Sequence, residues 1–538
     1  MIWGICVIEW LSLPSSDRPS FFTLYFEQPD GAGHTFGPDS NEVNSNMIFV
    51  DAMLNYLFHR LDQQQLLGCI NIILISDHGM QSLRPDHFIK IFEDERIMNS
   101  KDAYIKATSA AHIYLKGDLA KLSNPLDAFP HLMCQKGEYY RAYTAKTMPR
   151  NRHYTGRRVG EIFLDTVIGA VPMENKKKFD EWQNKGGHGY NNVLKSMRAI
   201  FGALGPSFKT KTTIPPFQNI ELYNLFVDVL NLPNRAPNNG THGTLFTTLK
   251  NPPEYETSEA QFFPKCDIEI NLLKCGDSCH FKLPLSNETF CYGTQQLGYS
   301  QSLSEMNLCE LHFCNASIML DNEQKPIITQ SLIRHPIPNI DHRANCSLRI
   351  HDGNLTECQR KSFKGTISLF SKNSINYYFE QARIPAPKGF IDGAWKSLVE
   401  MISKYTQHYS TLRIWAGPIW DNDNNGLIDP IRNGKNASHV FIVLLRCSAG
   451  NWASDFTHCK DETKTRVLSF ILPLIEKDYN CLDPTVYLFQ NMARVRDVEL
   501  LTDFEFFIDR NVYSPKMALQ LRTEVKEELW QLEQDIQH

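Results

Sequence analysis

Short apolar runs alternate with amphipathic stretches over the first half of the chain. The runs FFTLYF (21–26) and INIILIS (70–76) are dense in β-branched, aromatic and aliphatic residues, which is typical of strands buried in a parallel sheet. Residues 47–65 and 219–232 repeat apolar side chains at helical spacing. This alternation of strand and helix predicts an α/β fold with a doubly wound parallel sheet.

The pattern changes after residue 250. Residues 251–314 are rich in proline, cysteine and polar residues, which predicts a cross-linked, extended linker. Beyond it, the strand-like runs HVFIVLLRC (439–447) and VLSFILPLI (467–475) accompany a helical pattern over 390–405. We therefore expect an α+β second domain, and the predicted divisions of the chain are 1–250, 251–314 and 315–538.

The composition is that of a soluble globular protein. Its 538 residues, 42% hydrophobic and 21% charged, leave room for two or three domains and argue against general disorder. The formal net charge of −5 argues against non-specific nucleic-acid binding through a basic surface. This net charge does not exclude a small phosphate substrate that binds at a metal ion.

Cysteines concentrate in the second half, where eleven of the fourteen lie between Cys266 and Cys481. This density favours disulfides and an oxidising compartment. Zinc is the alternative, but no paired histidine pattern accompanies the close set Cys266, Cys275, Cys279, Cys291, Cys309 and Cys314. Glycosylation sequons support an extracellular glycoprotein and begin at Asn239, Asn287, Asn315, Asn345, Asn354 and Asn436.

The first residues contrast with these extracellular features. The stretch MIWGICVIEWLSLP has no basic leader, is interrupted by Glu9 and is too short to span a membrane. We therefore expect that the chain lacks its natural beginning. Whether the whole protein is secreted or membrane-anchored would depend on that segment, and the oligomeric state stays open.

Two of the predicted strands run into candidate metal ligands. Asp30 follows FFTLYF through a Pro-Asp-Gly turn, His34 returns four residues later through two glycines, and Asp77 and His78 follow ILIS directly. A third candidate, His188, lies in the glycine-rich stretch KGGHGYNN, where glycine permits close backbone approach. A turn, a chance Asp-His pair and a loop histidine are the structural alternatives. Taken together, the two acids and three histidines fit a borderline metal such as zinc.

Several motifs resemble the ecto-nucleotide pyrophosphatase/phosphodiesterase family, a branch of the alkaline phosphatase superfamily. They are PSFFTLYFEQPDGAGH, SDHGM, GGHGYNN, GPSFK and APNNGTHGTL, together with GPIWDNDNNGLIDP and ARVRDVELLTDFEF towards the C-terminus. The resemblance extends over nearly the whole chain. It implies an alkaline phosphatase-like parallel sheet flanked by helices, a disulfide-rich linker and an α+β nuclease-like domain.

The resemblance also implies two zinc ions held by three histidines and three aspartates, with a threonine nucleophile. By motif, Asp30, His34 and His188 match the ligands of one ion. Asp77 and His78 match two of the three ligands of the other. Two such ions clamp the attacking and leaving oxygens of an in-line phosphoryl displacement.

The chain departs from the family at its start. The threonine nucleophile and the remaining aspartate ligand lie, in the family, upstream of the stretch that begins at Pro19, where this chain has only Met1 to Arg18. We therefore expect no catalytic nucleophile, one tightly and one weakly bound zinc, and impaired turnover. Loss of the preceding strands would also leave an exposed sheet edge.

The sequence DNDNNGLID has the spacing of an EF-hand-type calcium loop, with oxygen ligands at alternate positions and glycine at the sixth. A solvated acidic turn is the alternative. The family resemblance supports a structural calcium bound by the side chains of Asp421, Asp423, Asn425 and Asp429 and by the carbonyl of Leu427. The nuclease-like domain is expected to be catalytically inactive, because Asp341-His342-Arg343 does not match the Asp-Arg-Gly-His motif of active nucleases.

We thus expect an extracellular metal-dependent phosphodiesterase that acts on small nucleotides or phosphodiesters, without specific nucleic-acid binding. Two alternatives stay open. One is a non-catalytic relative or binding protein, which the absent nucleophile favours. The other is a lysophospholipase of the autotaxin kind within the same family.

Overall fold

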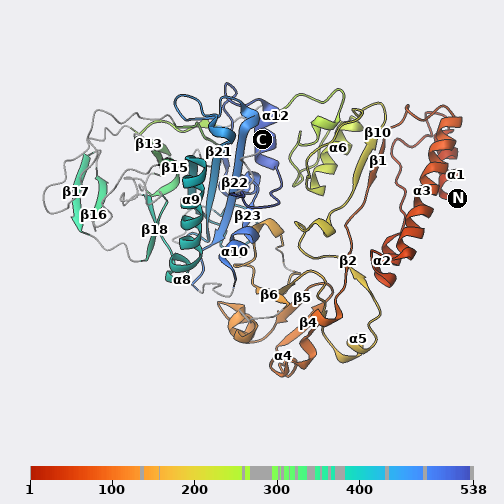
Figure 1. The fold of residues 1–538 in the computed structure, drawn as a ribbon, viewed down its shortest axis with the longest axis horizontal. Coiled ribbons are helices and arrows are strands. Elements are labelled where there is room, and N and C mark those ends of the chain that lie inside the picture. Colours follow the sequence, from red (N-terminus) through yellow and green to blue (C-terminus); the bar gives the residue numbers. More distant parts are fainter. Residues whose placement is uncertain are drawn as a thin grey trace. The chain divides into compact units, whose positions relative to one another are not determined.

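The computed structural model shows two compact units (Figure 1). The first comprises residues 1–145 and 156–254, and the second comprises residues 146–155 and 255–538. The short segment 146–155 thus belongs to the second unit, although its neighbours in sequence belong to the first. The structure describes residues 2–133, 139–154, 156, 158–256, 261–266, 294–300, 303, 308–313, 316–321, 325–335, 346–351, 354–360, 365–369, 382–429, 436–476 and 482–532.

The first unit contains mostly short elements. Its helices are α1 (Ile2–Leu11), α2 (Asp30–Phe36), α3 (Asn41–Gln63), α4 (Glu95–Met98), α5 (Lys176–Asp180) and α6 (Leu222–Val229). Its strands are β1 (Ile72–Ile75), β2 (Gln81–Ser82), β3 (Ile89–Lys90), β4 (Ala103–Ala107), β5 (Ala111–Leu115), β6 (Tyr140–Tyr143), β7 (Ile162–Thr166), β8 (Pro172–Met173), β9 (Gly186–Gly187) and β10 (Phe201–Leu204).

Both predicted helices of this unit are confirmed. The pattern over 47–65 lies largely within the 23-residue α3, which begins where the Ser40 hydroxyl accepts a hydrogen bond from the Val43 amide. The pattern over 219–232 contains α6. None of the helices in the described ranges is long and apolar enough to cross a membrane.

The main core of the first unit lies on an antiparallel sheet in the order β4-β5-β7-β6. Strand β5 pairs with β7 so that Ile113 lies opposite Ile162 and Ala111 opposite Leu164. These four side chains are fully buried. Alternate residues of each strand point to the same face, so the strands bury one apolar face against the surrounding turns.

The predicted doubly wound parallel sheet is not seen among the described residues of this unit, in which one short pair, β3 with β8, is parallel. The run 70–76 contains strand β1, as expected, but β1 pairs antiparallel with β10. The strand predicted over 21–26 is wrong, since that segment has no ladder partner among the described residues and alternates between exposed and half-buried side chains. Phe22 and Leu24 instead pack with α1 and α3. An apolar run therefore predicted extended backbone but could not specify a pairing partner or its direction.

The second unit is centred on a larger sheet. Its strands are β11 (Gln261–Phe262), β12 (Gly298–Tyr299), β13 (Cys309–Phe313), β14 (Ala316–Leu320), β15 (Pro326–Arg334), β16 (Cys346–His351), β17 (Asn354–Arg360), β18 (Thr366–Ser368), β19 (Arg383–Pro385), β20 (Thr411–Ile419), β21 (His439–Cys447), β22 (Thr465–Pro473), β23 (Met492–Ala493) and β24 (Phe504–Glu505). Its helices are α8 (Lys388–Phe390), α9 (Lys396–Tyr409), α10 (Pro484–Gln490), α11 (Val495–Thr502) and α12 (Pro515–Thr523).

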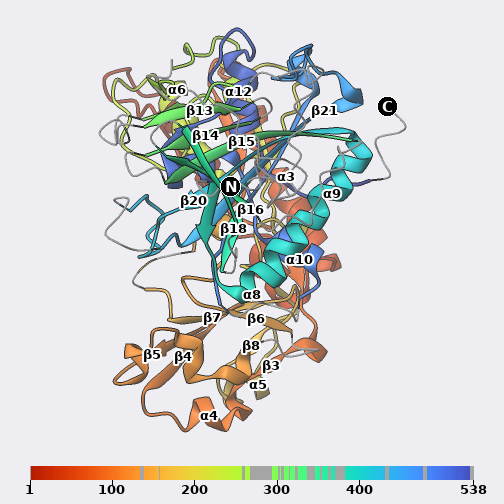
Figure 2. The same ribbon diagram turned by 90° about the vertical axis from the view of Figure 1, so that its left-hand side faces the viewer.

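Seven strands form one antiparallel sheet in the order β13-β14-β15-β20-β21-β22-β23. Strand β21 is buried along its whole length, and its residues alternate between two cores: Phe441 and Val443 face one, Val440 and Ile442 the other. Helix α9 packs against the second face of the sheet, and Figure 2 shows this helix beside the strands. Helices α11 and α12 contribute to the first. The predicted strands over 439–447 and 467–475 and the helix over 390–405 are confirmed.

Two disulfides are present among the described residues. Cys266 is joined to Cys309, and Cys447 to Cys459. The expectation of disulfide cross-links is thereby confirmed for these four residues, while Cys275, Cys279, Cys291 and Cys314 lie outside the described residues.

Candidate metal centres

Asp30 and His34 lie on the same face of α2, one helical turn apart. Asp30 is the first residue of the helix, and its Oδ2 lies 3.5 Å from Nε2 of His34. The prediction that Asp30 ends a strand and that glycines turn the chain back to His34 is therefore wrong. The i, i+4 spacing brings the two side chains together without a turn, because residues four apart are neighbours on a helix.

The glycines of this region serve close packing. A Cβ added to Gly186 would lie 2.2 Å from the carbonyl oxygen of Gly33, and one added to Gly33 would lie 3.0 Å from Cε of Met80. The Lys185 amide also donates to the carbonyl of His34. The absence of a side chain at Gly186 thus lets α2 approach β9, as the sequence predicted for the stretch around His188, and glycine at position 33 leaves room for Met80.

His188 completes a cluster of ligand-type atoms. It follows β9, and its Nε2 lies 3.2 Å from Nε2 of His34 and 3.7 Å from Oδ1 of Asp30. Its ring stacks on that of His78 with the centroids 3.5 Å apart. Asp77 lies at the edge of the cluster, with Oδ2 3.5 Å from Nε2 of His78. The structure therefore brings together all five side chains that the sequence singled out.

Backbone carbonyls orient two of the imidazole rings. Nδ1 of His34 donates to the carbonyl of Gly186 at 3.0 Å, and Nδ1 of His78 donates to the carbonyl of Gly79 at 2.9 Å. Since a carbonyl only accepts, each neutral ring carries its proton on Nδ1 and presents the lone pair of Nε2 to the cluster. Hydrogen bonds of this kind fix the tautomer and orientation of metal-binding histidines.

The separations fit a tetrahedral ion. Zinc with nitrogen and oxygen ligands at 2.0–2.1 Å places neighbouring ligand atoms roughly 3.3 Å apart. The contacts are 3.5 Å from Asp30 Oδ2 to His34, 3.7 Å from Asp30 Oδ1 to His188 and 3.2 Å between the two histidines, so both oxygens of Asp30 take part. Oδ1 of Asp30 is buried without a hydrogen-bond partner among the described residues. Asp30, His78 and His188 each offer one ligand atom within 4.8 Å of the others, and this Asp30 oxygen is free to bind an ion.

Electrostatics also favour neutral imidazole at this position. Burial lowers the pKa of His188, and the neighbouring His78 lowers it further, while the Asp30 carboxylate opposes the shift. A ring that loses its proton more readily offers a free lone pair for coordination.

Gly186→Ala tests the close approach of α2 and β9. The new methyl group would overlap the Gly33 carbonyl, so the helix carrying Asp30 and His34 must shift. We expect a loss of about 1–3 kcal/mol in the stability of the first unit, and weaker zinc binding. Gly202→Ala is the matched control, because no atom in the described part of the chain lies within 4 Å of its added Cβ. Denaturant unfolding and zinc titration of both variants check this; equal behaviour would contradict it.

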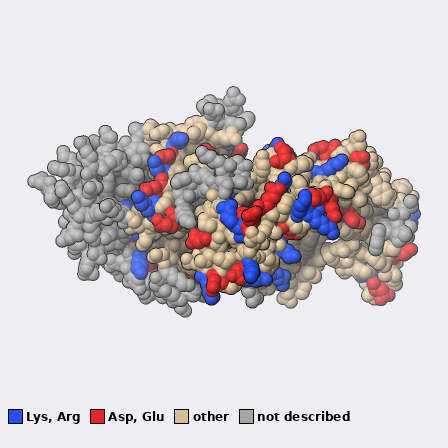
Figure 3. All heavy atoms as spheres, turned by 90° about the horizontal axis from the view of Figure 1, so that it is seen from below, with Lys and Arg blue, Asp and Glu red and all other residues tan. Residues whose placement is uncertain are grey.

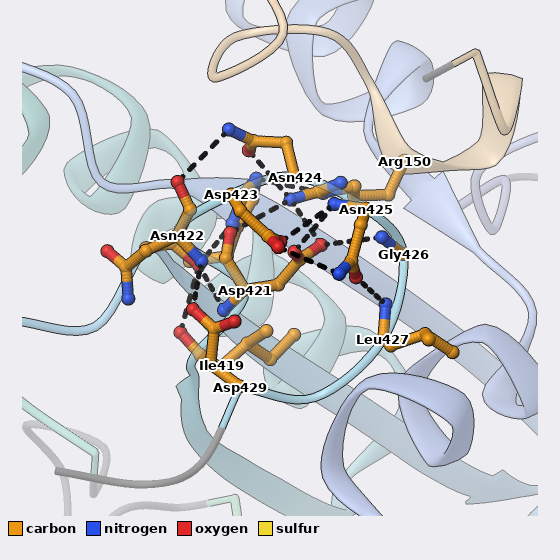
Figure 4. Close-up of polar contacts among 12 residues, drawn as sticks. Arg150, Ile419, Asp421, Asn422, Asp423, Asn424, Asn425, Gly426, Leu427 and Asp429 are labelled. Atoms are coloured by element: carbon orange, nitrogen blue, oxygen red, sulfur yellow. Dashed lines mark hydrogen bonds and ion pairs between the residues drawn. The ribbon is translucent and has the colours of Figure 1, made fainter. Parts of the chain in front are cut away.

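The second candidate site is the loop that follows β20 (Figure 4). Asp421 is fully buried, and its two carboxylate oxygens accept hydrogen bonds from the amides of Asn425 and Gly426. Asp423 also accepts from the Asn425 amide, and Asp429 accepts from the amide of Asn422 at 2.7 Å. Side-chain oxygens thus gather around a tight turn, as the EF-hand-type pattern predicted, and an all-oxygen donor set suits calcium.

One residue of this loop needs a glycine. Gly426 has φ +86°, a conformation that side-chain-bearing residues rarely adopt. Leu427 follows, its amide donating to Oδ1 of Asn425 at 2.8 Å while its side chain is exposed. The glycine at the sixth position of the motif is therefore explained by backbone geometry.

Two basic residues beside this loop were not predicted from the sequence. Nη2 of Arg150 lies 2.8 Å from Oδ2 of Asp421, and its Nε donates to Nε2 of His439 at 3.2 Å. Burial raises the pKa of Asp421; the charge of Arg150 opposes that rise, and Asp423 adds to it. Arg150 and Asp421 are 271 residues apart in sequence, so no local pattern links them.

The pKa of His439 gives a pH-dependent prediction. Burial, and then the charge of Arg150, hold this pKa well below the ordinary value of 6.5. Below about pH 6.5 the unfolded chain binds a proton that the folded chain does not. The free energy of unfolding therefore falls by up to about 1.4 kcal/mol for each unit by which the pH is lowered. His439→Gln keeps a neutral acceptor for Arg150 and should flatten this fall between pH 7 and 5.

Denaturant unfolding of the second unit at several pH values measures this slope. The control is His408→Gln, which changes an exposed histidine of α9 and should leave the slope as in the wild type. An unchanged slope in the His439→Gln variant would show that another group causes the acid sensitivity. The prediction that the nuclease-like domain is catalytically inactive rests on Asp341-His342-Arg343. These three residues lie outside the described residues.

The comparison with known proteins places the first cluster within a defined family. Residues 5–191, which include the five clustered side chains, match the family of type I phosphodiesterases / nucleotide pyrophosphatases. Venom phosphodiesterase 2 of Crotalus adamanteus is 31% identical over 96% of this chain, and the match covers 69% of that protein. The chain belongs to the ectonucleotide pyrophosphatase/phosphodiesterase family. The resemblance drawn from the sequence motifs is confirmed.

Other members of the ectonucleotide pyrophosphatase/phosphodiesterase family match over a similar length. A Caenorhabditis elegans ectonucleotide pyrophosphatase/phosphodiesterase is 27% identical over 97% of this chain, which covers 61% of that protein. Family member 3 of Bos taurus is 26% identical over 96% of the chain, with 64% of that protein covered. The chain thus spans between 61% and 69% of the length of these relatives.

Proposed function

We propose that the full-length protein is an extracellular, zinc-dependent nucleotide pyrophosphatase/phosphodiesterase that releases nucleoside 5′-monophosphates from nucleotides and phosphodiesters. The observation that carries the proposal is the convergence of Asp30, His34 and His188, whose ligand-type atoms lie 3.2–3.7 Å apart. Family membership supplies the reaction class, since the matching family is that of type I phosphodiesterases / nucleotide pyrophosphatases.

The five residues divide into two groups. Asp30, His34 and His188 would hold one zinc ion, and Asp77 and His78 would contribute to a second. When bound, the two ions would polarise the phosphoryl group and neutralise charge on the attacking and leaving oxygens. The carbonyls of Gly186 and Gly79 keep the rings of His34 and His78 aimed at the cluster. The attacking group and the remaining ligand are not among these five residues.

A structural calcium ion is the proposed role of the loop after β20. Asp421, Asp423, Asn425 and Asp429 would bind it through side-chain oxygens, and Leu427 through its carbonyl.

The distribution of charge supports a small substrate for the zinc centre. On the face shown in Figure 3, lysine and arginine side chains lie among aspartates and glutamates over the described residues. Such a mixed surface creates no single-sign field of the kind that guides long nucleic acids.

The extracellular location rests on two observations. The disulfides Cys266–Cys309 and Cys447–Cys459 are of a kind that persists in oxidising compartments. In addition, several relatives are venom phosphodiesterases by name.

The test is hydrolysis of the nitrophenyl ester of thymidine monophosphate by the full-length protein. A strong chelator should abolish the activity, and added zinc should restore it. Activity that survives both the chelator and His188→Ala would contradict the proposal. The lysophospholipase alternative is tested in parallel with lysophosphatidylcholine, whose preferential cleavage would reassign the substrate class while retaining the metal centre.

A further inference from the structure

Arg150 lies in an unusual position beside the candidate calcium loop (Figure 4). Its side chain is 6% exposed, and the Asp421 carboxylate that it contacts is fully buried. The same guanidinium donates to Oδ1 of Asn424 at 3.0 Å and to Nε2 of His439 at 3.2 Å. A permanent positive charge is thus buried within hydrogen-bond distance of a residue that the motif assigns to cation binding.

The backbone around Arg150 is anchored independently of the loop. Arg150 begins a 3-10 turn, Arg150–Arg152, that ends at His153 in a left-handed conformation. Nδ2 of Asn151 donates to the carbonyl of Gln490 at 3.1 Å, and Nε2 of His153 lies 3.5 Å from Oδ1 of Asp497. The segment 146–155 therefore holds the guanidinium in place through contacts with other parts of the second unit.

We infer that Arg150 is a built-in counter-ion of the calcium loop, which keeps the loop folded without calcium and lowers its affinity for calcium. The inference rests on the proposed calcium site. The Arg150 charge offsets the burial of Asp421, which would otherwise leave an unpaired charge. Because calcium would bind beside the same carboxylate, the fixed positive charge repels it.

Two effects of removing this charge act in the same direction. Without Arg150, an entering calcium ion no longer meets a nearby positive charge. The calcium-free loop also becomes less stable, because Asp421 stays buried beside Asp423 without its counter-charge. Both effects increase the difference in free energy between the calcium-bound and calcium-free states. The variant should therefore bind calcium more tightly and depend on it more strongly for folding.

Calcium titration by isothermal calorimetry tests this on the full chain. Arg150→Met, which keeps much of the length without the charge, should lower the calcium dissociation constant by about tenfold. Arg150→Lys retains the positive charge and should stay close to the wild type. The matched control is Lys464→Met, which removes an exposed positive charge next to Thr465, at the opposite end of strand β22 from the residue that pairs with His439. This control should leave calcium affinity unchanged.

The outcomes separate the inference from the calcium site itself. If the wild type binds one calcium ion and Arg150→Met binds it no more tightly, the counter-ion role is wrong. If neither protein binds calcium, the proposed calcium site is wrong, and the inference with it. If Arg150→Met folds only with calcium, the variant is prepared in the calcium-bound form. The rate at which it releases calcium to a fluorescent chelator is then measured. Slower release than in the wild type supports the inference, and equal or faster release overturns it.

Discussion

His188→Ala should lower the affinity of the protein for zinc by at least about 100-fold, since losing even an outer partner of a ligand costs 10–100-fold. The imidazole of His188 lies between the two groups of predicted ligands. It is 3.2 Å from His34 on one side and stacks on His78 on the other. Its removal should leave the first ion with Asp30 and His34 alone.

Competition with a chromophoric zinc chelator measures this loss. His59→Ala is the matched control, because His59 is an exposed histidine of α3 whose ring forms a hydrogen bond with the side chain of Gln63. The control should bind zinc as the wild type does. If His188→Ala binds zinc as tightly as His59→Ala, His188 is not a ligand.

Phe441→Ala should destabilise the second unit by about 3–5 kcal/mol, the usual cost of removing a buried aromatic ring. Phe441 is a fully buried residue of β21, and the centroid of its ring lies 6.3 Å from that of Phe504. The large expected loss follows from this position between the sheet and the residues that cover its first face.

Guanidinium unfolding followed by tryptophan fluorescence measures this loss, since Trp415 lies in the same core. Phe262→Ala makes the same chemical change in the second unit at a residue that is 52% exposed. Exposed substitutions of this kind usually change stability by less than about 0.5 kcal/mol. Similar losses in the two variants would contradict the proposed role of the β20–β21 region as the core of this unit.

The sequence predicted elements best where one residue pattern determines the structure. Strand β21 and helices α3 and α9 have continuous apolar or helical patterns, and all were predicted correctly. The strand over 21–26 was wrong because strand formation requires a partner, which its own residues do not specify. For the same reason, the antiparallel pairing of β1 with β10 could not be predicted.

The candidate site shows the same division. The sequence predicted that Asp30, His34, Asp77, His78 and His188 would meet, and the structure brings them together. The prediction placed Asp30 and His34 close together through a strand end and a turn, whereas one turn of helix α2 brings them together. Arg150 and His439 could not be predicted, because their contacts with the calcium loop join distant parts of the chain. The identity of both metals and the impaired turnover expected of this chain stay predictions.

Anomalous X-ray scattering at the zinc absorption edge, from crystals grown with zinc, tests the central claim most directly. We expect a strong peak among Asp30, His34 and His188, and a second, weaker peak beside Asp77 and His78. Zinc bound elsewhere, with no peak at the first three residues, would show that these side chains do not form a metal centre.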